Sequence, residues 1–321
     1  MFLTVSQYIH LEDREKKFVF SFSFPKILLA ILLCLFWRTD KVCLPNNFND
    51  ALQTFIKSTD FAELVMMTKK SSRDPFEMTD DVVYIPFKGA TIVSSIIVSG
   101  GFVLCIILAL VYHFERTTWT HCQVPNYLPS ISAAISVPPS AYIWRLVVAS
   151  CASQRLCTVV FHHKHYSNIF VPNSYYRRLC KLCFGSEFLE NLCLIGLTCI
   201  SSTENHGLHA MFFIGFQLFA VIFMFLMCIV YSMATMSEDN SHTKSLKWKW
   251  GAFLTNVAAF VTAMGFYYLH NAYCRPGVYT VFAFLEYIIV LSNIAYHVCV
   301  SLDFSDREIR FGVIQSKNSL N

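Results

Sequence analysis

The chain has 321 residues, of which 55% are hydrophobic and 14% are charged, and its mean hydropathy is +0.47. This composition is too apolar for an ordinary soluble domain of the same length. The net charge of +4 is modest and comes from basic residues scattered between apolar segments, so it gives no indication of nucleic-acid binding. We therefore expect a membrane protein that has no nucleic-acid partner.

Residues 1–81 are interpreted as a variable N-terminal extension. They contain an apolar run at 18–37 that Pro25 and Lys26 interrupt. A membrane helix needs about 20 apolar residues, and the uninterrupted part of the run, 27–37, is shorter than that. An extra hydrophobic helix, a signal anchor and a hydrophobic segment without a partner remain alternative interpretations.

From residue 82 onward the pattern becomes regular and predicts an all-α fold, a polytopic transmembrane helical bundle with six core spans. The spans are expected at about 90–114, 141–161, 184–203, 208–231, 251–269 and 278–302. Residues 82–306 would form this transmembrane domain, and residues 307–321 would form a cytosolic tail.

The distribution of Lys and Arg between the spans predicts the orientation of the bundle. The connections at 162–186 and 232–250 and the segment after 302 hold four, three and three such residues, ten in all. The opposite connections, 115–140, 204–207 and 270–277, hold only Arg116 and Arg275. Because basic loops stay in the cytosol, the second set is expected to face the lumen.

Ionisable residues inside the predicted spans are costly and are usually retained for a partner or a function. Glu286, Asn293 and His297 are separated by seven and four positions, so they share one helix face. Arg145 lies at a depth similar to that of Glu286, and we expect the two to form an ion pair. A second polar cluster is expected nearer the cytosol, formed by Arg155, Glu190 and His297. A purely structural contact between helices is the alternative role for these groups.

The expected lumenal connections bring together a dense set of polar and aromatic residues. Histidine titrates near neutral pH and a carboxylate can orient it, so general acid or base catalysis is one interpretation. The candidate catalytic residues are His121, His270, Glu204 and His206. The candidate lipid or headgroup contacts are Asn126, Tyr127, Arg145, Asn271, Tyr273 and Glu286. Histidines at helix ends also serve as simple interfacial residues, which is the alternative.

Cysteines provide two further hypotheses. Cys122 and Cys274 both lie in expected lumenal connections, where an oxidising compartment permits a disulfide between them. On the cytosolic side, the segments FHHKHYS at 161–167 and CKLC at 180–183 contain zinc-ligand residue types, but their spacing is not that of a common zinc finger. Juxtamembrane cysteines are also typical of palmitoylation sites. We predict no metal site and no cofactor.

Three segments carry a resemblance to a known family. They are HCQVPNYLPSIS from residue 121, ENLCLIGLTCISSTE from residue 190 and HNAYCRPGVYTVFAFLEYIIVLSNIAYH from residue 270. Together, and in this order, they resemble the post-GPI attachment to proteins factor 2 family, within the wider Frag/DRAM/Sfk group of multi-pass membrane proteins. The resemblance covers about residues 82–306, so the N-terminal extension lies outside it.

The resemblance implies a Golgi membrane protein, with the endoplasmic reticulum as a second location, that is required for lipid remodelling of GPI anchors. In that process a lyso-GPI-anchored protein is reacylated with a saturated chain, which supports its maturation and surface expression. The implied partners are GPI-anchored proteins, membrane lipids and other GPI-remodelling proteins.

Two classes of activity follow from the resemblance. In the first, the protein is itself the acyltransferase, and acyl-CoA or a phospholipid is the acyl donor; His121 or His270 would act as the base. In the second, it is a non-catalytic lipid-binding protein or a scaffold for a separate acyltransferase.

Overall fold

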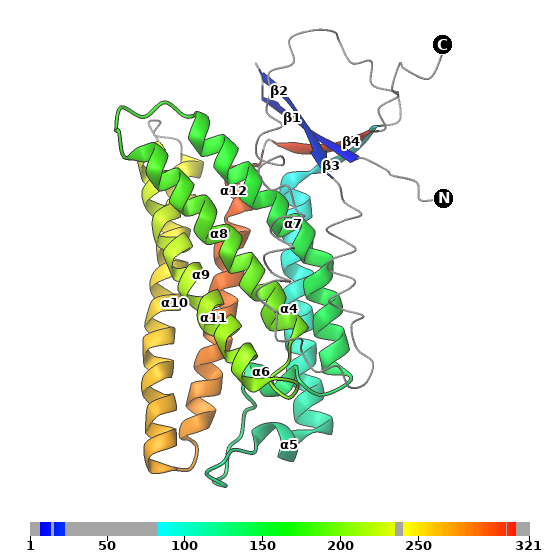
Figure 1. The fold of residues 1–321 in the computed structure, drawn as a ribbon, viewed down its shortest axis with the longest axis vertical. Helices are drawn as coiled ribbons and strands as arrows, with labels where there is room; N and C mark the ends of the chain where they lie inside the picture. The colour runs from blue at the N-terminus through cyan, green and yellow to red at the C-terminus, as the bar shows by residue number, and fades with distance from the viewer. Residues whose placement is uncertain (1–6, 14–15, 23–81, 235–239, 306, 313–321) are drawn as a thin grey trace, which may run out of the picture.

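The computed structural model describes residues 7–13, 16–22, 82–234, 240–305 and 307–312. Within these residues, six long helices run up and down and lie side by side (Figure 1). They are α4 (Phe87–Tyr112), α7 (Ser140–Asn168), α8 (Tyr176–Cys199), α9 (His206–Ala234), α10 (Asn240–Tyr273) and α11 (Val278–Val298), the last continued by α12 (Val300–Asp303). All six are long and apolar enough to cross a membrane, which confirms the predicted transmembrane helical bundle.

The helices extend beyond the predicted spans mainly at one end of the bundle. Helix α7 continues to Asn168, α8 begins at Tyr176 and α10 begins at Asn240, so polar turns are added to each apolar stretch. A hydropathy pattern locates the apolar part of a helix, whereas backbone hydrogen bonding continues through polar residues that favour helix.

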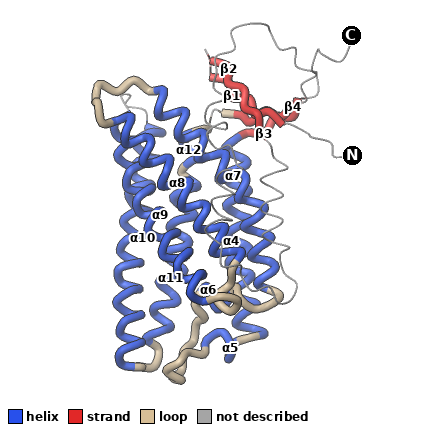
Figure 2. The backbone as a smooth tube through the Cα atoms, in the orientation of Figure 1, coloured by secondary structure: helices blue, strands red, loops and turns tan. Residues whose placement is uncertain are grey.

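Short elements distinguish the two ends of the bundle (Figure 2). Helices α5 (Phe114–Thr118) and α6 (Ile131–Ala134) lie at the end formed by residues 113–139, 200–205 and 274–277, which we call the loop end. Four antiparallel strands lie at the other end, in the order β2-β1-β4-β3: β1 (Gln7–Asp13), β2 (Lys16–Phe22), β3 (Val82–Pro86) and β4 (Glu308–Gly312). The sequence did not predict this small sheet. Residues 18–22 of the N-terminal apolar run belong to β2, and residues 23–37 of it lie outside the described residues.

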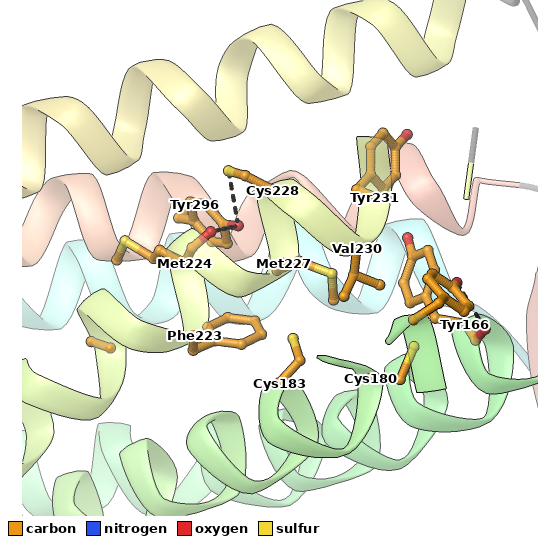
Figure 3. Close-up of a cluster of buried hydrophobic side chains, with 12 residues drawn as sticks. Tyr166, Cys180, Cys183, Phe223, Met224, Met227, Cys228, Val230, Tyr231 and Tyr296 are labelled. Carbon is orange, nitrogen blue, oxygen red and sulfur yellow. Dashed lines mark hydrogen bonds between the residues drawn. The ribbon is translucent and has the colours of Figure 1, made fainter. Parts of the chain in front are cut away.

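A cluster of buried aromatic and sulfur-containing side chains fills the space between α8, α9 and α11 (Figure 3). Tyr296 of α11 donates its hydroxyl to the Met224 carbonyl of α9 at 2.8 Å, so its polar atom is satisfied inside this cluster. Cys180 and Cys183 are 3% and 4% exposed within it. The CKLC cysteines therefore act here as small apolar side chains, and this packing supports neither zinc binding nor palmitoylation.

Small residues allow α8 and α9 to approach closely, as is common between membrane helices. A Cβ atom at Gly196 would lie 2.6 Å from the ring of Phe212, and one at Gly215 would lie 2.9 Å from the Cys193 sulfur. These two glycines thus set the distance between the helices. The hairpin formed by α8 and α9 carries residues 200–205 at the loop end.

One ion pair is buried near the sheet end. Lys249, predicted to lie in a cytosolic loop, is instead a fully buried residue of α10 whose Nζ lies 2.5 Å from the Asp303 carboxylate. Ser245 donates to the other carboxylate oxygen at 2.7 Å, and the ammonium lies 3.7 Å from the Tyr231 ring centroid. The pair fastens α10 to α12 because neither charge has access to water.

Breaking this pair is expected to destabilise the bundle. Asp303→Asn leaves the Lys249 ammonium buried without a counter-charge, which should cost about 3–5 kcal/mol. The double change Lys249→Met with Asp303→Leu removes both charges and should restore most of the loss. Thermal unfolding in detergent measures both, with the exposed Lys247→Met as the control. A double variant as unstable as Asp303→Asn would contradict the pairing.

Candidate functional site

The connection between α5 and α6 is fastened along the start of α11 at the loop end. Four hydrogen bonds hold it: Gly277 N to Pro125 O at 3.0 Å, Tyr127 N to Thr280 Oγ1 at 2.9 Å, Tyr287 Oη to Pro129 O at 2.5 Å, and Ile131 N to Glu286 Oε2 at 3.1 Å. These bonds satisfy backbone groups that would otherwise be left without partners near the membrane. They also determine where α6 lies.

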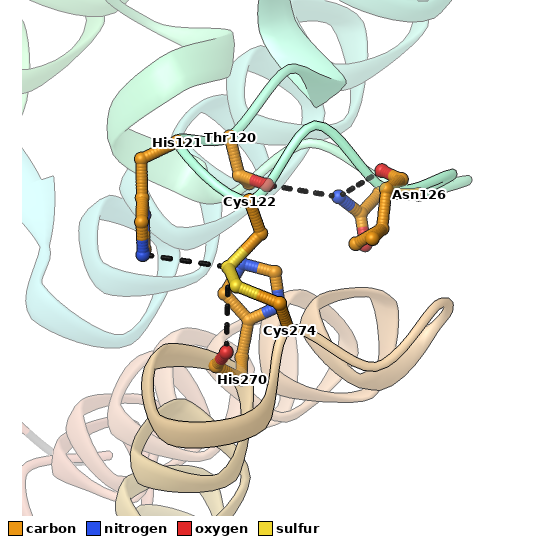
Figure 4. Close-up of a disulfide and its surroundings, with 7 residues drawn as sticks. Thr120, His121, Cys122, Asn126, His270 and Cys274 are labelled. Atoms are coloured by element: carbon orange, nitrogen blue, oxygen red, sulfur yellow. Dashed lines mark hydrogen bonds between the residues drawn. A yellow bond between two sulfur atoms is a disulfide. The ribbon is translucent and has the colours of Figure 1, made fainter.

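Asn126, predicted to contact a lipid headgroup, instead closes this connection (Figure 4). Its side-chain amide donates to Val124 O at 3.1 Å and to Thr118 O at 3.3 Å, and the side chain is buried. Tyr127 and Tyr273, by contrast, are exposed at the loop end, as is Asn271. These three side chains are available to a ligand at that surface.

The predicted disulfide is present. Cys122 and Cys274 are joined with an S–S distance of 2.12 Å, which ties the connection before α6 to the end of α10 (Figure 4). The rings of His121 and His270 lie beside it, with centroids 5.7 Å apart. His270 is 1% exposed, and neither of its ring nitrogens has a hydrogen-bond partner among the described residues. Two of the four candidate catalytic residues are thus neighbours.

Arg145 has a different partner from the one predicted. Its Nη2 lies 2.7 Å from Glu204 Oε2, and it also donates to the Cys199 carbonyl at 3.1 Å. Glu286 accepts instead from the backbone N–H of Ile131, so the predicted pair between Arg145 and Glu286 is wrong. The tight turn after α8 brings Glu204 back over the end of that helix, and depth along separate helices does not reveal such a turn.

Two effects act on the pKa of Glu204. Partial burial alone would raise it, but the Ser201 backbone N–H at 2.9 Å and the Arg145 guanidinium together hold the pKa below its usual value. Glu204 is therefore ionised and forms an ion pair with Arg145. His206 is exposed at the start of α9, and no described hydrogen bond or ring contact joins Glu204 or His206 to the pair of His121 and His270.

The predicted second polar cluster is confirmed. Arg155 Nη2 lies 2.8 Å from Glu190 Oε1, and His297 Nε2 lies 3.1 Å from the same oxygen. Asn293 donates to Glu190 at 3.0 Å, and Asn191 accepts from Arg155 at 2.6 Å. The other oxygen of the fully buried Glu190 has no partner among the described residues.

A cavity extends from α6 at the loop end to this cluster. Apolar side chains of α4, α7, α8, α9 and α11 line most of it, among them Val98, Trp144, Val148, Ala152, Leu194 and Phe216. Its polar lining comes from Ser132, His209 and Glu286 near the loop end and from Arg155, Asn191 and Asn293 at the inner end. Apolar walls with a few convergent polar groups are typical of small-molecule sites.

Ser132 and His209 form a polar pair in this cavity that the sequence analysis missed. Ser132 Oγ lies 2.8 Å from His209 Nε2, and His209 Nδ1 lies 2.7 Å from the Ile200 carbonyl. The available signals were weak: His209 follows His206 by three positions on a helix, and Ser132 ends the segment HCQVPNYLPSIS. A serine beside an oriented histidine is an arrangement that can support nucleophilic catalysis.

The lowered pKa of Glu204 predicts a specific acid sensitivity. Its ionised form stabilises the fold fully above the ordinary Glu pKa of about 4.3, and this contribution is lost as the pH falls through the lower folded value. Glu204→Gln should therefore show a smaller loss of stability than the wild type between about pH 5 and pH 3. The difference should be below about 1 kcal/mol because the pair is partly exposed.

Thermal unfolding across this pH range measures the effect. The matched control is Glu115→Gln, because Glu115 is exposed at the loop end and forms no ion pair among the described residues. Identical acid profiles for the wild type and Glu204→Gln would contradict the assigned role.

Comparison with known proteins agrees with this architecture. Residues 86–307 match the model of the family described as Frag1/DRAM/Sfk1/Cwh43P N-terminal domain. A curated relative from Xenopus tropicalis named "Acyltransferase PGAP2" is 40% identical over 211 residues, which cover 65% of this chain and 84% of the relative. Another, from Caenorhabditis briggsae and named "Post-GPI attachment to proteins factor 2", is 37% identical over 236 residues, 72% of this chain and 90% of the relative.

No solved structure matches the chain. A relative from Drosophila melanogaster, also named "Post-GPI attachment to proteins factor 2", is 35% identical over 224 residues, 68% of this chain and 86% of the relative. The family model covers the whole helical bundle, including the connections at the loop end. The chain therefore belongs to the post-GPI attachment to proteins factor 2 family, within the Frag1/DRAM/Sfk1/Cwh43P group of multi-pass membrane proteins.

Proposed function

We propose that this protein acts in the lipid remodelling of GPI anchors in the Golgi membrane, as an acyltransferase that reacylates lyso-GPI-anchored proteins with a saturated chain. The names of its relatives, "Acyltransferase PGAP2" and "Post-GPI attachment to proteins factor 2", support this reaction class. The basic residues at the sheet end support an orientation with the loop end in the lumen. GPI anchors lie in the leaflet that faces the lumen, so the loop end is the end that reaches them.

The observation that carries the proposal is the length and position of the cavity. On α7 its lining runs from Trp144 to Arg155, a distance of about 16 Å at about 1.5 Å per residue. The hydrocarbon layer is about 30 Å thick, so the cavity spans about one leaflet, beginning at the loop end. An acyl chain that extends from a lumenal headgroup would occupy this depth.

The polar groups are placed where such a substrate carries polar atoms. Ser132, His209 and Glu286 lie at the end of the cavity near the loop end, and the apolar lining lies deeper. At the loop end, the exposed residues His121, Asn271 and Tyr273, together with the buried His270 beside His121, are the groups that we assign to the anchor headgroup. The inner cluster around Glu190 closes the cavity and determines how far a chain enters.

Turnover by the purified protein tests the proposal. Protein in nanodiscs is given a lyso-GPI-anchored protein with either palmitoyl-CoA or a dipalmitoyl phospholipid, and the diacylated product is measured by mass spectrometry. We expect product with one of the two donors. Ala152→Phe, which places an aromatic ring in the cavity, should lower turnover while the lipid-facing Ala258→Phe should not. Product formation by Ala152→Phe at the wild-type rate would show that the cavity does not hold the chain.

Absence of product with both donors, in protein that still binds lyso-lipid, would instead identify a lipid-binding accessory protein. Lipid binding is measured in the same nanodiscs by crosslinking a photoactivatable lyso-phospholipid. This outcome would retain the cavity as a binding site and reject the acyltransferase assignment.

The two neighbouring histidines provide a separate test at the loop end. His121→Ala together with His270→Ala removes both imidazoles and should raise KM with little change in kcat, because both residues are assigned to the headgroup. A fall in kcat of about 10²-fold would instead identify one of them as the base. The matched control is His113→Ala, also at the loop end, and an unchanged kcat/KM in the double variant would remove both residues from the site.

A further inference from the structure

Ser132 and His209 come from different elements and meet at the wall of the cavity. Ser132 lies in α6 and His209 lies one turn into α9, and the Ser132 Oγ to His209 Nε2 distance is 2.8 Å. Both residues line the cavity. His209 is 4% exposed, so its ring is shielded from bulk water and is directed at the serine.

The hydrogen bonds determine the protonation pattern of the pair. A backbone carbonyl only accepts, so His209 Nδ1, 2.7 Å from Ile200 O, must carry the proton of a neutral imidazole. His209 Nε2 then holds the lone pair and accepts from the Ser132 hydroxyl. This is the arrangement of an activated serine, in which a base adjoins the nucleophile and a third group orients the base.

Contacts on both sides hold Ser132 in place. The preceding N–H, that of Ile131, donates to Glu286 at 3.1 Å, and the Ser132 carbonyl accepts from Ser202 Oγ at 3.4 Å. Ser130 caps the same short helix by accepting from Ala133 N at 3.3 Å. Ser132 is therefore carried by a segment that is bound to α11 and to the turn before α9, which limits the movement of its side chain.

We propose that Ser132 and His209 are the catalytic nucleophile and base of a covalent acyl transfer, in which Ser132 carries the acyl chain as an ester while the chain occupies the cavity. This inference rests on the proposed function and identifies the reacting atoms. The donor is a fatty acyl thioester or a phospholipid acyl ester, which share the electrophilic acyl carbonyl carbon.

The two half-reactions balance without an oxidant or a reductant. Ser132 Oγ attacks the acyl carbonyl carbon of the donor and its proton passes to His209 Nε2; the donor C–S or C–O bond then breaks, and the leaving thiol or alcohol takes that proton. In the second half, the lyso-lipid hydroxyl attacks the Ser132 ester and gives its proton to His209. The ester bond to Ser132 breaks, and the serine oxygen recovers the proton.

Reaction with a fluorophosphonate tests the nucleophile without the GPI substrate. The full-length protein in nanodiscs is treated with an alkyl fluorophosphonate, and the modified residue is located by peptide mass spectrometry. We expect the label on Ser132. Ser132→Ala should abolish it, and His209→Gln should slow it by about 10²-fold or more because the base is lost. Ser136→Ala is the matched control, because Ser136 lies two residues after α6 and, among the described residues, bonds only to the Ala133 carbonyl.

Acid quenching during turnover tests the intermediate and identifies the donor. Protein is mixed separately with palmitoyl-CoA and with a dipalmitoyl phospholipid, both with labelled acyl chains, and the Ser132 peptide is examined for the ester. A palmitoylated Ser132 peptide in one arm confirms the proposal and names the donor. Circular dichroism and gel filtration establish that each variant is folded.

Two results would overturn the proposal: wild-type turnover by folded Ser132→Ala, or the absence of both the fluorophosphonate label and the acyl ester from Ser132. In either case, product formed from lyso-GPI would leave the proposed function intact and indicate direct transfer. If the fluorophosphonate labels Ser132 but no product forms from lyso-GPI, the result would support Ser132 and His209 as nucleophile and base and would exclude lyso-GPI as the acyl acceptor.

Discussion

The attachment of residues 125–131 to the start of α11 is the constraint on which the arrangement of the loop end depends. A connection of this length at a membrane surface has many backbone groups to satisfy, and four hydrogen bonds to α11 and its preceding turn satisfy them in one register. Glu286 takes part through its side chain, which reaches the Ile131 N–H from within the span. The disulfide between Cys122 and Cys274 closes the same unit from the other side. This attachment determines where α6 lies, and with it the part of the cavity wall and the candidate nucleophile, Ser132, that α6 contributes.

Three ion pairs hold helices and turns of the bundle together. Lys249 pairs with Asp303, Arg155 with Glu190, and Arg145 with Glu204, each within 2.8 Å. A cation without a partner in a low-dielectric interior would be unstable, and each of these three cations lies beside a carboxylate. The pairs also lie at different depths, with one at the loop end, one within the bundle and one near the sheet end. They thus fasten the helices at three levels.

The cavity connects the fold to the proposed chemistry. Its apolar lining reaches about one leaflet deep and its polar groups gather near the loop end, an order that matches the polar head and apolar tail of a lipid. The histidines of the loop end are divided between two environments. His121 and His270 lie beside the disulfide, whereas His209 is buried against Ser132 and receives its orientation from the Ile200 carbonyl. Binding of the headgroup and transfer of the chain are therefore assigned to distinct groups of residues.

Several features could be predicted from the sequence, because hydropathy, helical spacing and loop assignment depend only on the order of the residues. These features are the number and order of the spans, the cluster of Arg155, Glu190 and His297, and the pairing of Cys122 with Cys274. The partner of Arg145, the burial of Lys249 and the meeting of Ser132 with His209 could not, because each depends on how a turn or a short helix folds back in three dimensions. Hydropathy and the placement of Lys and Arg along the chain are enough to establish a membrane bundle that contains ionisable residues within its spans. The partner of each of these residues, and the contact between Ser132 and His209, follow from the three-dimensional packing, because contacts between separate helices do not depend on the periodicity of any one helix.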